Sequence, residues 1–147
     1  MSKKNKGGGN KLTNIIPGTI CELVHNDSVM FRIIHVNDCG YPFSDLSVHV
    51  GMGYDGFTEG NHCVAYTPEY KECTPERKKM FFELVDKCRD ERMRNLFITY
   101  ETIREDGMYN MITDADVIMY EMGVDKDTYF NIIKNYNELR KKYENFL

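Results

Sequence analysis

The pattern of apolar residues changes along the chain, from short β-branched, apolar runs bounded by turn residues in the first half to helical spacing in the second. Residues 18–24 and 29–36 are β-branched and apolar, and four turn-forming residues, His25-Asn26-Asp27-Ser28, separate them. This pattern predicts a β-hairpin. Both alternating faces of residues 29–36 are largely apolar, so this strand is expected to be central in its sheet.

Two further strands are expected at residues 46–50 and 62–66, which completes a small antiparallel sheet over about residues 18–66. The glycine-rich stretch between them, with Gly51, Gly53 and Gly56, matches the GxGxxG pattern of dinucleotide sites. Such a site needs a helix directly after the glycines, whereas strand-like residues follow here. The stretch is therefore interpreted as a surface loop, and no cofactor is expected.

Helical spacing begins after Thr74-Pro75-Glu76, a strong helix start in which threonine caps, proline takes the first helical position and glutamate complements the dipole. The apolar residues that follow lie on one face, which predicts an amphipathic helix over about residues 75–93: Met80, Phe81, Leu84, Val85 and Cys88. Residues 96–103 are rich in β-branched and aromatic residues, so a strand is favoured there, with a helix as the alternative.

The last third of the chain predicts two helices hinged on Gly123, an αα-hairpin over about residues 114–146. Gly123 suits the left-handed conformation that often ends a helix, and Val124 can make the accompanying apolar contact. The whole pattern predicts an α+β fold, in which residues 13–147 form a single domain.

Composition adds one segment to this picture, a flexible basic arm over residues 1–12 that carries Lys3, Lys4, Lys6 and Lys11. The arm is a candidate for contact with a polyanion, the alternative being a solubilising tail. No apolar run approaches the roughly 20 residues of a membrane helix, so no membrane partner is expected. A signal peptide is not expected either, because no apolar stretch follows the lysines of the arm.

Five cysteines with irregular spacing favour free thiols in a reducing compartment, hence a cytoplasmic, intracellular location. No metal site is expected, since a zinc site from His62, Cys63 and Cys73 would lack finger spacing. No catalytic residue is assigned either. A small enzyme using histidine, aspartate and cysteine of the β half is an alternative, and it requires His49 or His62 to converge with an aspartate and a pocket.

The sequence pattern that runs from Gly123 through Thr128-Tyr129 to Ile132-Ile133-Lys134 resembles the core of helix-turn-helix regulators. This resemblance implies DNA binding, in which exposed residues of the second helix face a groove: Lys126, Asp127, Thr128, Asn131, Lys134 and Asn135. Lys126, Asn131 and Lys134 would read the DNA, with the lysines of the arm as phosphate contacts. Acidic residues in both helices do not suit a phosphate backbone.

A second resemblance concerns eukaryotic translation initiation factor 1A. The arm MSKKNKGGGNK is similar to the start of that family, and Ala115-Asp116-Val117-Ile118 and Asn137-Glu138-Leu139 are similar to its region after the oligonucleotide-binding barrel. The resemblance implies RNA as a partner, but residues 13–100 lack the family's basic segments, and no RNA-contacting residue is assigned from it.

Charge and composition favour a non-enzymatic binding protein that docks on a protein or nucleoprotein partner. The net charge is −4, and residues 13–67 hold six acids and one arginine, so an acidic β lobe or exposed helix faces could meet a basic surface. Only Ala65 and Ala115 are alanine, which suggests an AT-rich genome and, as one form, a viral or phage inhibitor of a host factor. A helix-turn-helix regulator is the alternative, and the small enzyme is the second alternative.

Overall fold

The structure of the protein is a computed structural model that describes residues 15–147, so the predicted arm lies outside the described residues. The chain divides into two compact units, unit 1 up to Arg89 and unit 2 from Asp90 onward. The described part of each unit has buried apolar clusters of its own. The single domain predicted over residues 13–147 stays a prediction.

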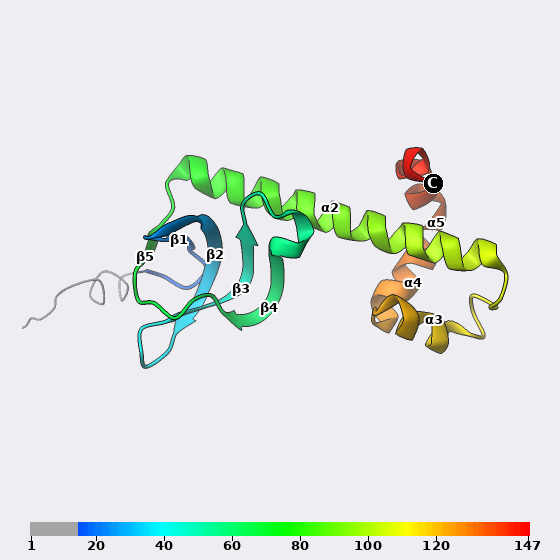
Figure 1. Ribbon diagram of the computed structural model, residues 1–147, viewed down its shortest axis with the longest axis horizontal. Helices are drawn as coiled ribbons and strands as arrows, with labels where there is room; N and C mark the ends of the chain where they lie inside the picture. The colour runs from blue at the N-terminus through cyan, green and yellow to red at the C-terminus, as the bar shows by residue number, and fades with distance from the viewer. Residues whose placement is uncertain (1–14) are drawn as a thin grey trace, which may run out of the picture. The chain divides into compact units, whose positions relative to one another are not determined.

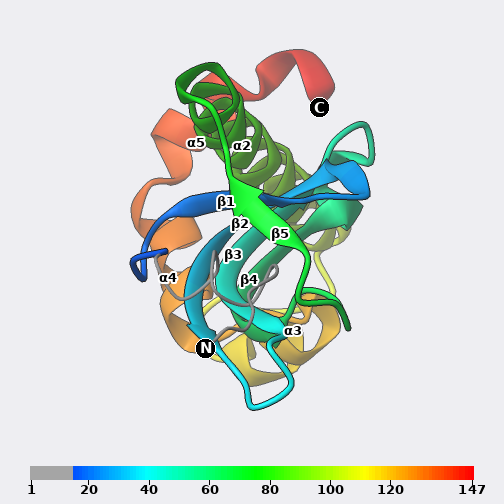
Figure 2. The ribbon, with the colours of Figure 1, turned by 90° about the vertical axis from the view of Figure 1, so that its left-hand side faces the viewer.

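Unit 1 is built on an antiparallel sheet of five strands (Figures 1 and 2). Each of the first three strands pairs with the next along the chain, and the fifth returns to pair with the first, in the order β4-β3-β2-β1-β5. The strands are β1 (Ile20–Leu23), β2 (Asn26–Val36), β3 (Pro42–His49), β4 (Phe57–Cys63) and β5 (Tyr70–Glu72). With the helices that follow, this confirms the predicted α+β fold.

Both faces of the sheet are buried, as the apolar pattern of β2 predicts. Met30 and Phe31 are adjacent and fully buried, and they belong to different clusters because neighbouring side chains on a strand point to opposite faces. Met30 lies with Leu46, Val48 and residues of the first half of the long helix. Phe31 lies with Tyr70, edge to face at 5.8 Å between ring centroids. Each fully buried side chain of this size contributes about 1.5–3 kcal/mol.

Two strand predictions need correction. The third strand begins at Pro42 rather than residue 46, and the fourth covers Phe57–Cys63 rather than 62–66. A fifth strand, Tyr70–Glu72, was not predicted. Phe57 is buried in the core beside Val48, its partner on β3, so the glycine-rich loop is shorter than expected and ends in a 3-10 turn, η1 (Gly53–Gly56).

The long helix α2 (Pro75–Asp106) begins where the sequence predicts, and Thr74 Oγ1 accepts the backbone N–H of Arg77 at 3.3 Å. It continues through residues 96–103, so the strand favoured there was wrong and the helical alternative is correct. Met93, Leu96, Phe97, Tyr100 and Ile103 recur at helical spacing and pack into the core of unit 2. The helix ends before Gly107, whose φ of +73° is left-handed.

Unit 2 adds α3 (Ala115–Met122), α4 (Lys126–Lys134) and α5 (Tyr136–Lys142), followed by the 3-10 turn η2 (Glu144–Phe146) (Figure 1). The predicted second helix of the hairpin is thus divided at Asn135. Tyr129 and Ile132 of α4 are fully buried against Phe97 and Tyr100 of α2. Among the described helices, none is long and apolar enough to cross a membrane.

Candidate binding surfaces and a histidine-lined hollow

The hinge between α3 and α4 has the predicted left-handed glycine. Gly123 lies at φ 69° and ψ 33°, its N–H is donated to Tyr120 O, and the N–H of Val124 is donated to Met119 O. This is the Schellman arrangement, and Val124 makes its apolar contact with the core of unit 2. Asp125 then caps α4, because its Oδ1 accepts the N–H of Thr128 at 2.8 Å. The hinge geometry predicted from the sequence is therefore present.

Most of the predicted groove-facing residues of the second helix are exposed, whereas Thr128 and Asn135 are half-buried. Lys126, Asn131 and Lys134 face solvent, and Asn131 Oδ1 accepts a hydrogen bond from Asn135 at 2.8 Å. Asp127, one turn before Asn131, is exposed as well and places a negative charge on the same side. The lysines of the arm, Lys3, Lys4, Lys6 and Lys11, lie outside the described residues.

A second surface of unit 2 was not singled out in the sequence. The loop after α2 and helix α3 expose four large apolar side chains: Met108 at 72%, Ile112 at 59%, Val117 at 47% and Tyr120 at 88%. Val117 and Tyr120 are neighbours one turn apart on α3, whose opposite side buries Ala115 and Ile118. We call these four residues the α3 surface.

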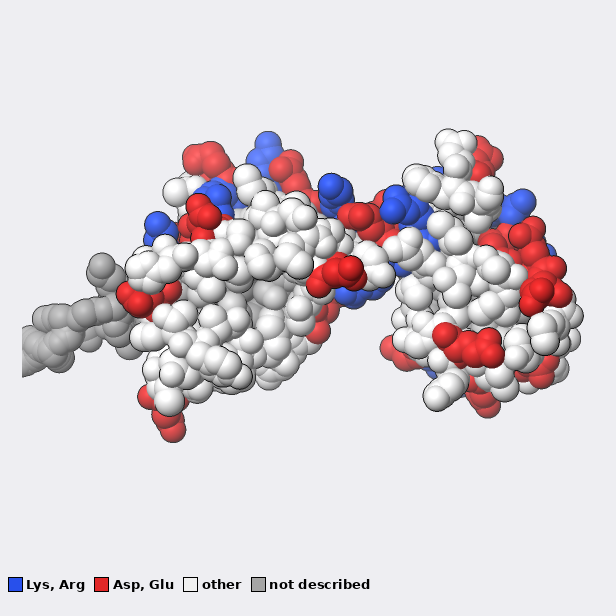
Figure 3. Space-filling view, in the orientation of Figure 1, with Lys and Arg blue, Asp and Glu red and all other residues white. Residues whose placement is uncertain are grey.

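All charged residues in the sequence stretch that carries the α3 surface are acidic. Residues 105–125 contain no lysine or arginine and six acids: Glu105, Asp106, Asp114, Asp116, Glu121 and Asp125. Figure 3 shows red and white atoms over this side of unit 2, with lysine and arginine mainly toward α5. Glu121 accepts a hydrogen bond from the Tyr109 hydroxyl at 3.1 Å, which raises the pKa of Tyr109. In the sequence, the feature that could have indicated the α3 surface is this stretch of acidic residues without a lysine or arginine.

A buried carboxylate joins α5 to α2 within unit 2. Glu101 is 2% exposed, and it accepts hydrogen bonds from Arg104 Nε at 2.7 Å, from the Tyr136 hydroxyl at 2.8 Å and from Arg140. Burial by itself raises the pKa of Glu101, but the hydrogen bonds from Arg104 and Tyr136 and the nearby positive charges bring it below its ordinary value. Glu101 therefore stays ionised and has a structural role.

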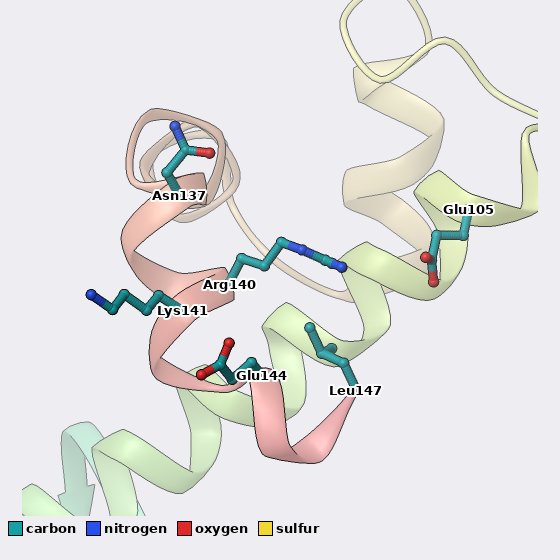
Figure 4. A pocket seen from close by; sticks show the side chains of 6 residues that line it. All are labelled: Glu105, Asn137, Arg140, Lys141, Glu144 and Leu147. Carbon is teal, nitrogen blue, oxygen red and sulfur yellow. The ribbon is translucent and has the colours of Figure 1, made fainter.

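A pocket of about 560 Å³ lies beside Arg140 and is shown in Figure 4. Arg140 points across it, whereas Lys141 points to the other side of α5. Two carboxylates, Glu105 and Glu144, line the same pocket as these two bases, and Arg140 already donates to Glu101. This mixed lining favours neither an anion nor a cation as ligand.

Two of the four histidines of unit 1 are engaged separately. His25 Nε2 lies 3.1 Å from Glu69 Oε1, and His35 stacks on Phe43 with ring centroids 4.6 Å apart. The other two, His49 and His62, line one hollow of about 310 Å³ together with Asp55 and Cys63. The small-enzyme alternative required this convergence, but sequence spacing did not reveal the residue that His62 actually contacts, Ser47.

The part of the chain that the structure describes contains all five cysteines, and none of them forms a disulfide. Burial raises the pKa of Cys21 and of Cys73 to about 12, so neither is a reactive thiolate near neutral pH. Within residues 15–147, no group of three or more histidine, cysteine, aspartate or glutamate side chains could hold a metal ion.

The glycine-rich loop is exposed at Gly51 and Gly53, both of which have positive φ. Gly56 lies so close to His49 that an added Cβ would be 2.9 Å from the histidine Cβ. The glycines therefore serve the turn between β3 and β4, consistent with the interpretation as a surface loop.

Comparison of the chain with protein-family models, with curated proteins and with solved structures gives no match. The resemblances to helix-turn-helix regulators and to translation initiation factor 1A therefore stay predictions, and the function has to be argued from the surfaces described above.

Proposed function

We propose that the chain is a binding protein that docks on a protein or nucleoprotein partner through the α3 surface. The observation that carries this proposal is the exposure of Met108, Ile112, Val117 and Tyr120 within a stretch whose charged residues are all acidic. Isolated exposed apolar residues are ordinary, but a tyrosine and three aliphatic or thioether side chains grouped on one loop and helix are typical of an interface.

The charge of the α3 surface defines the chemistry of the partner. An apolar patch among six carboxylates fits a segment that carries both apolar residues and lysine or arginine, because complementary potentials guide encounter and fix register. The same carboxylates repel phosphates, so a nucleoprotein partner would be met through its basic protein component. A basic groove of a host factor, blocked by a viral or phage protein, is one form of this function.

Tyr120 is the expected hot spot. It is 88% exposed, and truncation of a tyrosine at the centre of an interface costs about 2 kcal/mol or more, which weakens binding by roughly 30-fold. Tyr66, which is 84% exposed in unit 1, provides a matched control. Tyr120→Ala and Tyr66→Ala remove the same group from comparably exposed positions.

Affinity capture from the native host with the wild type and these two variants tests the proposal. We expect a protein that is retained by the wild type and by Tyr66→Ala and lost with Tyr120→Ala, and whose binding weakens as salt increases. If Tyr120→Ala captures the same proteins to the same extent as Tyr66→Ala, the α3 surface is not the docking site.

DNA binding through α4 is a second candidate, favoured by the left-handed hinge at Gly123 and by the exposure of Lys126, Asn131 and Lys134. A gel-shift titration on random duplex at low salt tests it. Binding with a steep salt dependence is expected if this candidate is correct, and Lys126→Ala with Lys134→Ala would reduce the salt slope by about two. Absence of binding at micromolar protein would exclude it.

A further inference from the structure

Ser47 and His62 form a hydrogen-bonded pair with a defined polarity. Ser47 Oγ lies 2.8 Å from His62 Nε2, and His62 Nδ1 lies 2.6 Å from the carbonyl oxygen of Gly60. A carbonyl oxygen only accepts, so the proton of the neutral ring must be on Nδ1. Nε2 is then the acceptor, and the hydroxyl of Ser47 donates to it. This is the polarity by which an imidazole activates a hydroxyl, with the Gly60 carbonyl fixing the tautomer.

A bulge in β4 positions the imidazole. Leu46 of β3 pairs with Glu59 and Ser44 pairs with His62, so one more residue of β4 than of β3 lies between these two pairs. Gly60 lies in the extra stretch at φ +92°, a conformation that L side chains rarely adopt. The bulge allows His62 to reach both Ser47 and the carbonyl of Gly60. Other serines of unit 1 bond elsewhere: Ser44 Oγ donates to Leu46 O and Ser28 Oγ to Asn26.

The pair lines an accessible hollow rather than the core. Ser47 and His62 are half-buried, and both line the hollow of about 310 Å³ in unit 1. Val29, Met52 and Val64 supply apolar lining. Ligand sites begin at about 300 Å³, so this hollow has room for a small acyl group.

We propose that Ser47 is a nucleophile toward small acyl esters, with His62 as its general base. This goes beyond the docking proposed for unit 2, because it places a reaction in unit 1. Ser47 Oγ forms a bond to the ester carbonyl carbon while its proton moves to His62 Nε2. The carbon–oxygen bond to the leaving group then breaks, and the imidazolium returns the proton to the departing alkoxide. A water molecule, deprotonated by the same ring, then forms a bond to the acyl carbon. The bond from that carbon to Ser47 Oγ breaks, and the imidazolium returns its proton to Ser47 Oγ, which releases the carboxylic acid and restores the serine.

A fluorophosphonate probe tests the nucleophile directly, because attack by Ser47 forms a phosphorus–oxygen bond and expels fluoride. Full-length protein is incubated with the probe, and the modified residue is identified by peptide mass spectrometry. The variants are Ser47→Ala, His62→Gln and, as a matched serine control, Ser28→Ala, each checked for unchanged thermal unfolding. Hydrolysis of p-nitrophenyl acetate is followed in parallel.

We expect the probe to label Ser47 in the wild type and in Ser28→Ala, and to leave no label at position 47 in Ser47→Ala. In His62→Gln, the rate of labelling at Ser47 should be at least about tenfold lower, because a general base contributes roughly 10²-fold or more to the rate. Ester hydrolysis should fall in the same order. Absence of label on Ser47 in the wild type overturns the proposal whatever the variants do. So does a His62→Gln rate within tenfold of the wild type, because the serine would then react without its base.

Discussion

Replacement of Glu101 by glutamine should destabilise unit 2. The glutamine keeps the volume of the side chain but removes the negative charge that accepts hydrogen bonds from Arg104, Tyr136 and Arg140. These three partners come from α2 and α5, so the loss should loosen the contact between these helices.

The magnitude follows from the number and exposure of the partners. A hydrogen bond to a charged group contributes about 1.5–3 kcal/mol. Arg104 and Arg140 are 40% and 48% exposed, however, so water can solvate them once the carboxylate is lost, and their contribution must be discounted. We expect a loss of about 2–3 kcal/mol in the free energy of unfolding, a roughly 30- to 150-fold increase in the open population.

The effect should depend on pH in one direction. The pKa of Glu101 is lower in the folded protein than its ordinary value, so the ionised form stabilises the fold. That contribution is complete above the unfolded pKa, about 4.5, and is lost as the pH falls through the folded value. The difference between wild type and Glu101→Gln should therefore be constant near neutral pH and shrink below about pH 4.5.

Hydrogen exchange measured on peptides from α4 and α5 reports the opening of unit 2 separately from unit 1. Glu138→Gln is the control, because Glu138 lies exposed on α5 and its change should stay within about 0.5 kcal/mol. Equal protection in Glu101→Gln and Glu138→Gln at pH 7 would refute this reasoning. So would a Glu101→Gln effect of the same size at pH 3 and pH 7.

Three further predictions concern other sites. Tyr70→Phe should stabilise unit 1 by about 1 kcal/mol in urea unfolding, because the buried Tyr70 hydroxyl has no hydrogen-bond partner within residues 15–147; a loss of stability would reveal a partner. Gly123→Ala should cost about 1–2 kcal/mol in the same assay, since φ is +69° but a Cβ meets nothing within 4 Å; an unchanged midpoint would contradict this. The exposed Cys39 should react rapidly with a disulfide reagent at pH 8, whereas Cys21 and Cys73 should react only on unfolding, and equal rates would argue against their burial.

The helices were predictable where capping and spacing agreed. Thr74-Pro75 marks the start of α2 and Gly123 the end of α3, and both features depend only on neighbouring residues. The strand predicted at residues 96–103 was wrong because the β-branched side chains there favour a strand locally. In the folded chain, Thr99 and Thr102 donate to the carbonyls of Asn95 and Ile98 one turn earlier, and packing in unit 2 outweighs the local preference.

The sites were less predictable because they depend on long-range register and exposure. Ser47 and His62 are fifteen residues apart, and only the pairing of β3 with β4 and the bulge at Gly60 bring them within hydrogen-bond distance. The exposure of Lys126 and Lys134 followed from helical periodicity. The α3 surface did not, since Val117 and Tyr120 could equally have been buried against another helix.

The return of β5 to β1 has a consequence for the order in which the chain can fold during synthesis. Cys21 pairs with Glu72, and the core against the sheet is filled by Phe81, Val85 and Cys88. A ribosome must therefore release the chain through about residue 88 before unit 1 can close, and the face of β2 that carries Met30 stays uncovered until then. During that interval, a chaperone that recognises apolar strands in nascent chains would bind β2.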